Sequence, residues 1–375
     1  MSLTSQLYRG ELGKWCARNL RTENLIADVA RHLRMAGNPE PVRPSGKVEA
    51  GHWAAVGGAF GARLALLVDG APPYYALLGA VRAGLAGRAW CEQAHLLFPT
   101  HREFPTDSAA RWSQYRPGSR GWIDMGGTID PGQPTGHEPV LTDFLRRTVA
   151  VLEEHAPPGA LGSPGVEASL ARSCWVISGW ESSYRGGRLP DDLAAAHAQP
   201  GYDATTLRQV ITEPVLAEMV ELARVLHTSR TIERWRGPSG AGADGPLGIS
   251  GPVIVPHWAD GDLVIGGGTL LDVKTAVRVD QDDTVSRWLW QILAYLWLDT
   301  QDLYELTSVG LYLARHGVTV SWGSDAFLSS LLGGNGRDDA AREQFLQLAA
   351  RVIREEGGHP PAPWKRRTTR RLGDG

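Results

Sequence analysis

The residues at positions 259–275 read ADGDLVIGGGTLLDVKT, in which two short apolar runs are separated by three consecutive glycines. Both runs are rich in Val, Leu and Ile, which favour strands, and glycine adopts turn conformations that other residues avoid. The pattern predicts strands over 262–265 and 270–275, joined by a hairpin at Gly266–Gly268. The segments around this hairpin alternate between helix and strand from residue 212 onward, which is typical of a mixed α/β unit.

Three charged side chains accompany the hairpin. Asp262 opens the first strand, and Asp272 and Lys274 lie two residues apart on the second. Because side chains alternate along a strand, Asp272 and Lys274 point to the same face of the sheet. Carboxylates bind hard divalent cations, which polarise a phosphate and lower the pKa of a bound water. A nearby ammonium can orient that water or offset charge growing on the phosphate. This combination predicts phosphodiester hydrolysis.

A nearly continuous apolar segment follows at Trp288–Leu298. It predicts a buried helix over 284–299, because the segment is apolar on every side. Gln291 and Tyr295 supply almost its only polar atoms, and a spacing of four residues puts them on one stripe of the helix. We expect this stripe to face the same cleft as Asp272.

These motifs together resemble those of the PD-(D/E)XK nuclease superfamily. Asp262 matches the first acid, and Asp272-Val273-Lys274 matches the (D/E)XK element. Gln291 and Tyr295 match the Gln-x-x-x-Tyr motif of the RecB-type branch of that superfamily. The resemblance covers residues 212–322, under a third of the chain.

The resemblance implies an α/β fold with a restriction-endonuclease-like core, which is a mixed β-sheet flanked by helices. It also implies Mg²⁺ or Mn²⁺ as the cofactor and DNA as the partner, with RNA left open. Members of the superfamily act in recombination, repair and defence against phage, so phage defence or DNA repair is the expected setting. The rival interpretation is a catalytically inactive protein of the same fold that binds DNA or serves as a scaffold. The intact Asp262, Asp272 and Lys274 favour the enzyme.

Superfamily members usually carry a further acid or histidine on the helix before the sheet. The helix predicted over 214–227 offers Glu218 and Glu221. At about 100° per residue, Glu218 lies about 80° from the centre of the apolar face and Glu221 about 140°. Glu218 is therefore the candidate third metal ligand, because it sits at the buried border. Asp260 is an alternative to Asp262, since alternation places both on one face, but the apolar strand follows Asp262 directly.

Each of these patterns also has a structural interpretation. A strand-end acid followed by Asp272 and Lys274 is compatible with a surface ladder of ion pairs. Gln291 and Tyr295 are compatible with satisfied polar groups inside a buried helix. Glu218 is compatible with an ordinary carboxylate at a helix border. The combination of the motifs, rather than any one of them, favours a nuclease.

The whole sequence predicts three parts. Residues 1–204 form a helical region of unknown role, residues 205–335 form the nuclease-like domain, and residues 336–375 form a C-terminal helix and a basic tail. Further helices are expected at 5–35, 52–68, 74–85, 142–155, 167–184, 205–211, 325–332 and 338–356, and further strands at 253–256, 309–314 and 318–322. An irregular connection is expected over 102–138 and a flexible loop over 237–251.

The composition limits the classes of protein. With 42% hydrophobic and 21% charged residues, the chain has enough apolar side chains for a packed core and is not disordered as a whole. No apolar run reaches the roughly 20 residues of a membrane span, and no secretory signal is visible, so we expect a cytoplasmic protein without a membrane partner. The three cysteines are too scattered for a disulfide framework.

Charge and residue usage add two observations. The net charge of −3 gives no overall sign of nucleic-acid binding, although a catalytic site can be locally basic on such a protein. The chain has 34 Arg but only 4 Lys, so Lys274 departs from the compositional default. The helical N-terminal region lacks a nucleophile motif or cofactor loop and is a candidate surface for a protein partner of unknown identity.

Overall fold

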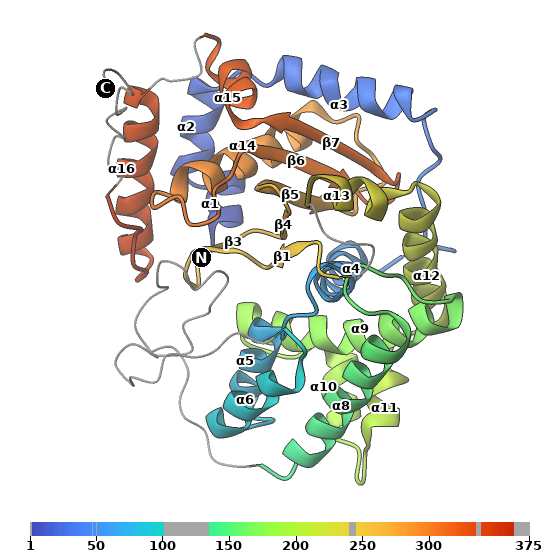
Figure 1. The fold of residues 1–375 in the computed structure, drawn as a ribbon. Coiled ribbons are helices and arrows are strands. Elements are labelled where there is room, and N and C mark those ends of the chain that lie inside the picture. The colour runs from blue at the N-terminus through green and yellow to red at the C-terminus, as the bar shows by residue number, and fades with distance from the viewer. Residues whose placement is uncertain are drawn as a thin grey trace, which may run out of the picture.

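The computed structural model describes residues 2–46, 48–49, 51–100, 135–239, 245–334 and 339–363. Helices come first along the chain, and strands and helices alternate after them (Figure 1). The first group is α1 (Leu3–Arg9), α2 (Glu11–Asn19), α3 (Glu23–Met35), α4 (His52–Val68), α5 (Tyr74–Arg82), α6 (Arg88–Ala94), the 3₁₀ turn η1 (His95–Leu97), α8 (Glu138–His155), α9 (Pro164–Gly186), α10 (Asp191–His197), α11 (Ala204–Arg208), α12 (Glu213–Thr228) and α13 (Thr231–Ser239). The second group is β1 (Gly248–Ser250), β2 (Val253–Val255), β3 (Ala259–Asp260), β4 (Leu263–Ile265), β5 (Thr269–Lys274), α14 (Asp282–Leu298), β6 (Ser308–Leu313), β7 (Val318–Gly323), α15 (Ser324–Leu332) and α16 (Asp339–Glu355).

Five strands form one mixed sheet in the order β1-β4-β5-β6-β7. Neighbouring strands are antiparallel, except that β5 and β6 run parallel. A parallel pair requires a long crossover connection, and α14 supplies it between β5 and β6. Strands β2 and β3 pair as a separate two-stranded ribbon. The predicted α/β class, with a mixed sheet flanked by helices next to a helical region, is confirmed.

The glycine hairpin between β4 and β5 has the predicted form. Ile265 pairs with Thr269, so the three glycines make the whole turn. Gly267 and Gly268 have φ of 84° and 77°, in the left-handed region that favours glycine. A Cβ on Gly268 would also lie 2.3 Å from the carbonyl oxygen of Glu305. Glycine at this position is therefore required both by the backbone conformation and by the neighbouring chain.

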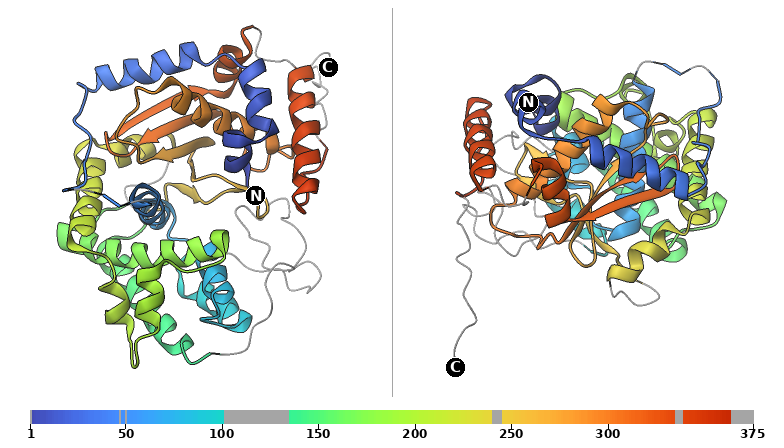
Figure 2. Two further views of the ribbon diagram at one scale, coloured as in Figure 1. Left: turned by 180° about the vertical axis from the view of Figure 1, so that it is seen from behind. Right: turned by 90° about the horizontal axis from the view of Figure 1, so that it is seen from above.

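Both faces of the sheet are buried. On one face, Leu270 and Leu311 pack with α14 and with the helices α1, α2, α3, α15 and α16. Figure 2 shows α2 lying between the sheet and α16 on this side. On the other face, Leu271 and Tyr312 pack with α4, α12 and α13. Because residues alternate along β5, Asp272 belongs to the α14 face.

A bundle of helices, α5, α6 and α8–α11, lies below the sheet in Figure 1, with α4 between the two. The bundle core includes Phe144 and Trp180, whose ring centres are 5.2 Å apart. Arg63 on α4 and Glu167 on α9 form a buried ion pair with N–O distances of 2.7 and 2.8 Å. Since α4 also contacts β1 and β4, it joins the bundle to the sheet.

The first three helices differ from the prediction in two ways. The run expected over 5–35 is broken into α1, α2 and α3. These helices pack on the α/β unit and not in the helical bundle, as shown by the contacts of Trp15 with Trp297 and Phe345. In space the α/β unit therefore includes helices α1–α3, although the predicted boundary lies at 204.

Other segments show where local patterns were insufficient. The stretch 237–251, expected as a loop, contains the end of α13 and strand β1. In β1, Gly248 lies so close to the next strand that a Cβ would be 2.1 Å from the carbonyl oxygen of Val264. Most of the connection expected over 102–138, and the basic tail after 363, lie outside the described residues. None of the described helices combines the length and hydrophobicity that crossing a membrane requires.

Replacing Trp15 with Ala tests whether the N-terminal helices are part of the α/β core. Trp15 is 7% exposed, and its ring centre lies 6.0 Å from that of Trp297 and 5.3 Å from that of Phe345. Removing a buried aromatic side chain costs about 3–5 kcal/mol, so we expect a loss of this size in the free energy of unfolding. Denaturant titration followed by circular dichroism measures it.

The matched control is Met35→Ala on α3, because Met35 is 74% exposed. An exposed substitution of this kind should change the free energy of unfolding by less than about 0.5 kcal/mol. If the Trp15 variant proved as stable as the Met35 variant, α2 would not be part of the core.

Candidate active site

The two acids of the hairpin face each other. In the antiparallel pair of β4 and β5, the last paired residues are Leu263 and Leu271. One step beyond them, the same register sets Asp262 opposite Asp272. The backbone N–H of Val273 donates to Oδ2 of Asp262 at 2.6 Å. The hairpin register therefore brings the two predicted metal ligands together.

Lys274 connects this pair of acids to α14. Its Nζ lies 2.5 Å from Oδ2 of Asp272 and donates to Oε1 of Gln291 at 3.1 Å. Nζ is also 5.8 Å from the centre of the Trp288 ring, within the range of cation–π attraction. The ammonium is thus positioned by a strand neighbour and by a helix. We call Asp262, Asp272, Lys274 and Gln291 the acid–lysine site.

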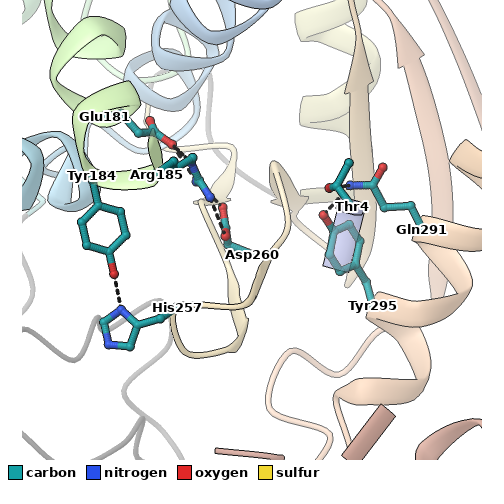
Figure 3. Close-up of polar contacts among 8 residues, drawn as sticks. All are labelled: Thr4, Glu181, Tyr184, Arg185, His257, Asp260, Gln291 and Tyr295. Atoms are coloured by element: carbon teal, nitrogen blue, oxygen red, sulfur yellow. Dashed lines mark hydrogen bonds and ion pairs between the residues drawn. The ribbon is translucent and has the colours of Figure 1, made fainter. Parts of the chain in front are cut away.

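Gln291 and Tyr295 lie on the side of α14 that faces the acids. The Gln291 amide nitrogen donates to the Tyr295 hydroxyl at 2.7 Å and to Oγ1 of Thr4 at 3.5 Å, as drawn in Figure 3. Because Gln291 also accepts from Lys274 and lines the same cavity as Asp272, the expectation of a shared cleft is confirmed for Gln291. Tyr295 is buried and meets the site through its hydrogen bond with Gln291. Thr4, on α1, is a neighbour that the local motifs did not predict.

Desolvation by the surrounding protein and neighbouring charges shift the pKa values of the acids and the lysine in this site. Asp272 is 2% exposed, and burial raises its pKa while Lys274 opposes the shift. Asp262 is reached by solvent, but the protein on its other sides and the charge of Asp272 raise its pKa to about 7. Burial lowers the pKa of Lys274, and the two carboxylates outweigh this effect, so its pKa lies above the ordinary value. One ammonium thus faces two carboxylates that repel each other, and a further cation here would relieve that repulsion.

Asp260, the alternative first acid, has a different role. Its two oxygens accept from the guanidinium of Arg185 at 2.8 and 3.3 Å, and Arg185 also donates to Glu181 at 2.7 Å. Figure 3 shows this ion-paired group on α9 and β3, separate from the group of Gln291. Asp260 therefore ties the helical bundle to the α/β unit, which supports the choice of Asp262 as the acid opposite Asp272.

Glu218, the predicted third ligand, is engaged by two other side chains. Its Oε1 accepts from Arg315 at 2.5 Å, and its Oε2 accepts from Nε2 of His52 at 2.9 Å. The side chains of Glu218 and Arg315 are 1% and 0% exposed. Arg315 also donates to the carbonyl oxygens of Thr275 at 2.5 Å and Val42 at 2.8 Å. The position at the buried border of α12 was predicted, but Glu218 neutralises a buried arginine there and does not join the acid–lysine site.

The two carboxylates present fit a Mg²⁺ site in which the protein supplies only a few of the ligands. Among the described residues, no three His, Cys, Asp or Glu side chains lie together as a set that could hold a metal ion. The predicted set of three carboxylates is therefore reduced to Asp262 and Asp272. Mg²⁺ commonly keeps several waters and uses only one or two carboxylates together with phosphate oxygens of a substrate. The two acids meet that requirement, and Mn²⁺ accepts the same oxygen ligands.

A cavity of about 560 Å³, which we call the inner pocket, adjoins the acid–lysine site. Strands β4 and β5 line one side, and α4, α5 and α9 line the other. Glycines on α4 let its backbone approach the sheet, since a Cβ on Gly57 would lie 2.9 Å from Oγ1 of Thr275. Several lining residues are far from the hairpin in sequence, and no local pattern pointed to them: Thr4, Tyr8, Tyr75 and Arg185.

Comparisons of the chain with models of protein families, with curated proteins and with solved structures give no match. The functional assignment therefore depends on the geometry of the acid–lysine site and on the topology of the sheet that carries it.

Replacing Glu218 with Gln tests its structural role. The amide preserves the shape but leaves Arg315 buried without a counter-charge, and removing one partner of a buried ion pair costs about 3–5 kcal/mol. We expect a decrease of this size in the free energy of unfolding. The affinity for Mn²⁺, measured by titration calorimetry on the folded protein, should be unchanged.

Glu221→Gln is the matched control on the same helix, because Glu221 is exposed and pairs with Arg224 at the surface. It should change neither stability nor metal affinity. Normal stability combined with lost Mn²⁺ binding in the Glu218 variant would make Glu218 a metal ligand.

Proposed function

We propose that the protein is a divalent-metal-dependent nuclease that hydrolyses phosphodiester bonds of DNA. The observation that carries the proposal is the acid–lysine site, in which two facing carboxylates, a lysine and a helix-borne glutamine meet on one face of a mixed sheet. The parallel pair of β5 and β6, with α14 crossing between them, is what sets these groups on the same face. The cofactor in this proposal is Mg²⁺ or Mn²⁺.

Each residue of the site has a separate role in the proposed hydrolysis. Asp262 and Asp272 would hold the cation, which when bound polarises the phosphate and lowers the pKa of a water. Lys274 is charged at neutral pH and lies where it can offset the negative charge that grows on the phosphate. Gln291 accepts from Lys274 and so directs the ammonium toward the acids, and Tyr295 accepts from Gln291 and orients its amide.

The proposed setting is the cytoplasm, with a role in phage defence or DNA repair. This setting follows from the superfamily resemblance of the motifs and not from the site geometry. The helical bundle below the sheet lines one side of the inner pocket and supplies none of the four residues of the acid–lysine site. The N-terminal region as a whole, residues 1–204, stays the candidate surface for a protein partner.

The direct test is incubation of the protein with linear, circular and single-stranded DNA and with RNA, each with Mg²⁺, Mn²⁺ or EDTA. Cleavage of DNA that requires the metal supports the proposal, and cleavage of RNA alone would change the substrate. The rival is an inactive nuclease-fold protein that binds DNA or serves as a scaffold. It would show no cleavage, and no heat of Mg²⁺ or Mn²⁺ binding that disappears in Asp262→Ala.

Asp272→Asn should abolish metal-dependent cleavage. The amide keeps the shape of the side chain but removes the charge, and too little negative charge then remains to retain a cation that prefers anionic oxygen ligands. Asp272→Ala should behave in the same way. Cleavage rates and Mn²⁺ calorimetry measure the effect, and Asp191→Asn at the protein surface, outside both the acid–lysine site and the cavities around it, is the control. Retained cleavage in both Asp272 variants would contradict the proposed ligand set.

Lys274→Ala should leave metal binding largely intact but slow the chemical step by roughly 10²–10³, the usual loss when one positioned electrostatic group is removed. Lys274→Arg should not restore the full rate, because guanidinium is planar and has a different reach from a compact ammonium. Single-turnover cleavage assays separate this step from binding. A wild-type rate in Lys274→Ala would show that the lysine is structural.

A further inference from the structure

We infer that the N-terminal part of the chain builds a groove that binds single-stranded DNA and leads it to the acid–lysine site. The inference rests on the proposed nuclease function and adds the form of the substrate and the surface that receives it. It also gives a role to residues before 212, which the superfamily resemblance does not cover.

A second cavity, of about 880 Å³, continues from the inner pocket. We call it the strand groove and define it by six of its lining residues: Tyr8, Arg43, Trp53, Lys274, Arg278 and Trp288. Tyr8, Ala54 and the stretch 273–275 line both cavities. Lys274 therefore stands where the two cavities meet, so a strand lying in the groove would pass the acid–lysine site.

The two cavities differ in their net charge. The inner pocket is lined by four carboxylates, those of Glu181, Asp260, Asp262 and Asp272, and by two cationic side chains, those of Arg185 and Lys274, so negative charge is in excess there. The described lining of the strand groove contains three cationic side chains, those of Arg43, Lys274 and Arg278, and no carboxylate. Arg278 pairs with Asp280 at the surface, and an exposed pair of this kind is weak enough to exchange for a phosphate. Negative charge is thus concentrated where a metal would be held, and positive charge where a phosphate backbone would run.

Two exposed aromatic rings favour a single strand over a duplex. Among the described residues, Tyr8 and Trp53 are the only exposed aromatic side chains, with 45% and 44% exposure, and both line the groove. An arginine lies against each ring, Arg287 at 5.2 Å from the centre of Tyr8 and Arg315 at 4.9 Å from that of Trp53. Unpaired bases stack on such rings, whereas bases in a duplex already stack on each other. The groove therefore combines the cationic and stacking groups that a single strand needs.

Half of the residues that define the groove come from separate N-terminal elements, and the other half come from β5, α14 and the segment between them. Tyr8 is on α1, Trp53 is in the first turn of α4, and Arg43 is on the segment between α3 and α4. The buried Arg315 holds this region together, because it contacts Trp53 and donates to the carbonyl oxygens of Val42 and Thr275. The same side chain thus fixes the position of Trp53 relative to the end of β5.

Binding of a fluorescein-labelled single-stranded DNA to the full chain in EDTA, followed by fluorescence anisotropy, tests the inference without cleavage. Trp53→Ala and Tyr8→Ala should each raise Kd roughly 5- to 150-fold, the range found for loss of one stacking ring. Trp53→Phe keeps an aromatic face and should retain most of the affinity. It also keeps the test valid if Trp53→Ala disturbs Arg315 and fails to fold.

The charge contribution is tested through the salt dependence. In the double variant with Arg43→Ala and Arg278→Ala, the slope of log affinity against log salt concentration should fall by about 1.4, because each phosphate contact on a single strand contributes about 0.7. Arg188→Ala is the control, since Arg188 is an exposed arginine paired with Asp191 outside both cavities. Its slope should equal that of the wild type.

The outcomes separate this inference from the proposed function. Equal affinity of wild type and the Trp53 and Tyr8 variants for the single strand would overturn the groove, even if the wild type cleaves DNA. Duplex DNA that competes as strongly as single-stranded DNA would overturn it as well. If the variants lose single-strand binding as expected but the wild type cleaves nothing with any metal, the groove is supported and the nuclease function fails.

Discussion

Two carboxylates held opposite each other on neighbouring strands are the constraint on which the rest of the structure depends. Asp272 is buried, while solvent reaches Asp262 beside it. The surrounding protein raises the pKa of both carboxyls, and the charge of Asp272 raises that of Asp262 further. Lys274, on the same strand as Asp272, offsets only part of this charge, and it needs a second contact to stay in place. That contact is Gln291 on α14, a helix that the parallel pairing of β5 and β6 requires in any case. Helix α14 therefore connects the two parallel strands and also supplies the side chain that holds Lys274 beside the acids.

Much of the fold could be predicted from local patterns. The hairpin at Gly266–Gly268 and the helix α14 were recognisable because strand alternation, glycine turns and continuous hydrophobicity are properties of short segments. The helix His52–Val68 was predicted with the bounds that the structure has. Strand β1 was missed because three residues are too few to show a period, and its pairing with β4 is a long-range contact.

The candidate site was predictable in part, for the same reason. The alternation of β5 and the spacing of Gln291 and Tyr295 are enough to place these side chains on common faces. The partner of Glu218 was not predictable, because Arg315 lies 97 residues further along the chain. Thr4 lies 287 residues from Gln291, and no periodic pattern relates the two. Local periodicity thus predicts which way a side chain points, but not which distant side chain it meets.

The docking of α1 onto segments more than 250 residues further along the chain has a consequence for biosynthesis. The N–H of Leu3 donates to the carbonyl oxygen of Trp258 at 3.0 Å, and the side chain of Gln6 donates to Glu356 across 350 residues of sequence. Helix α1 therefore finds these partners only after residues as far along as 356 have been translated, while the helical bundle can fold earlier. Because Thr4 of α1 touches Gln291, the packing around the acid–lysine site is complete only once segments far apart in the sequence have all been made.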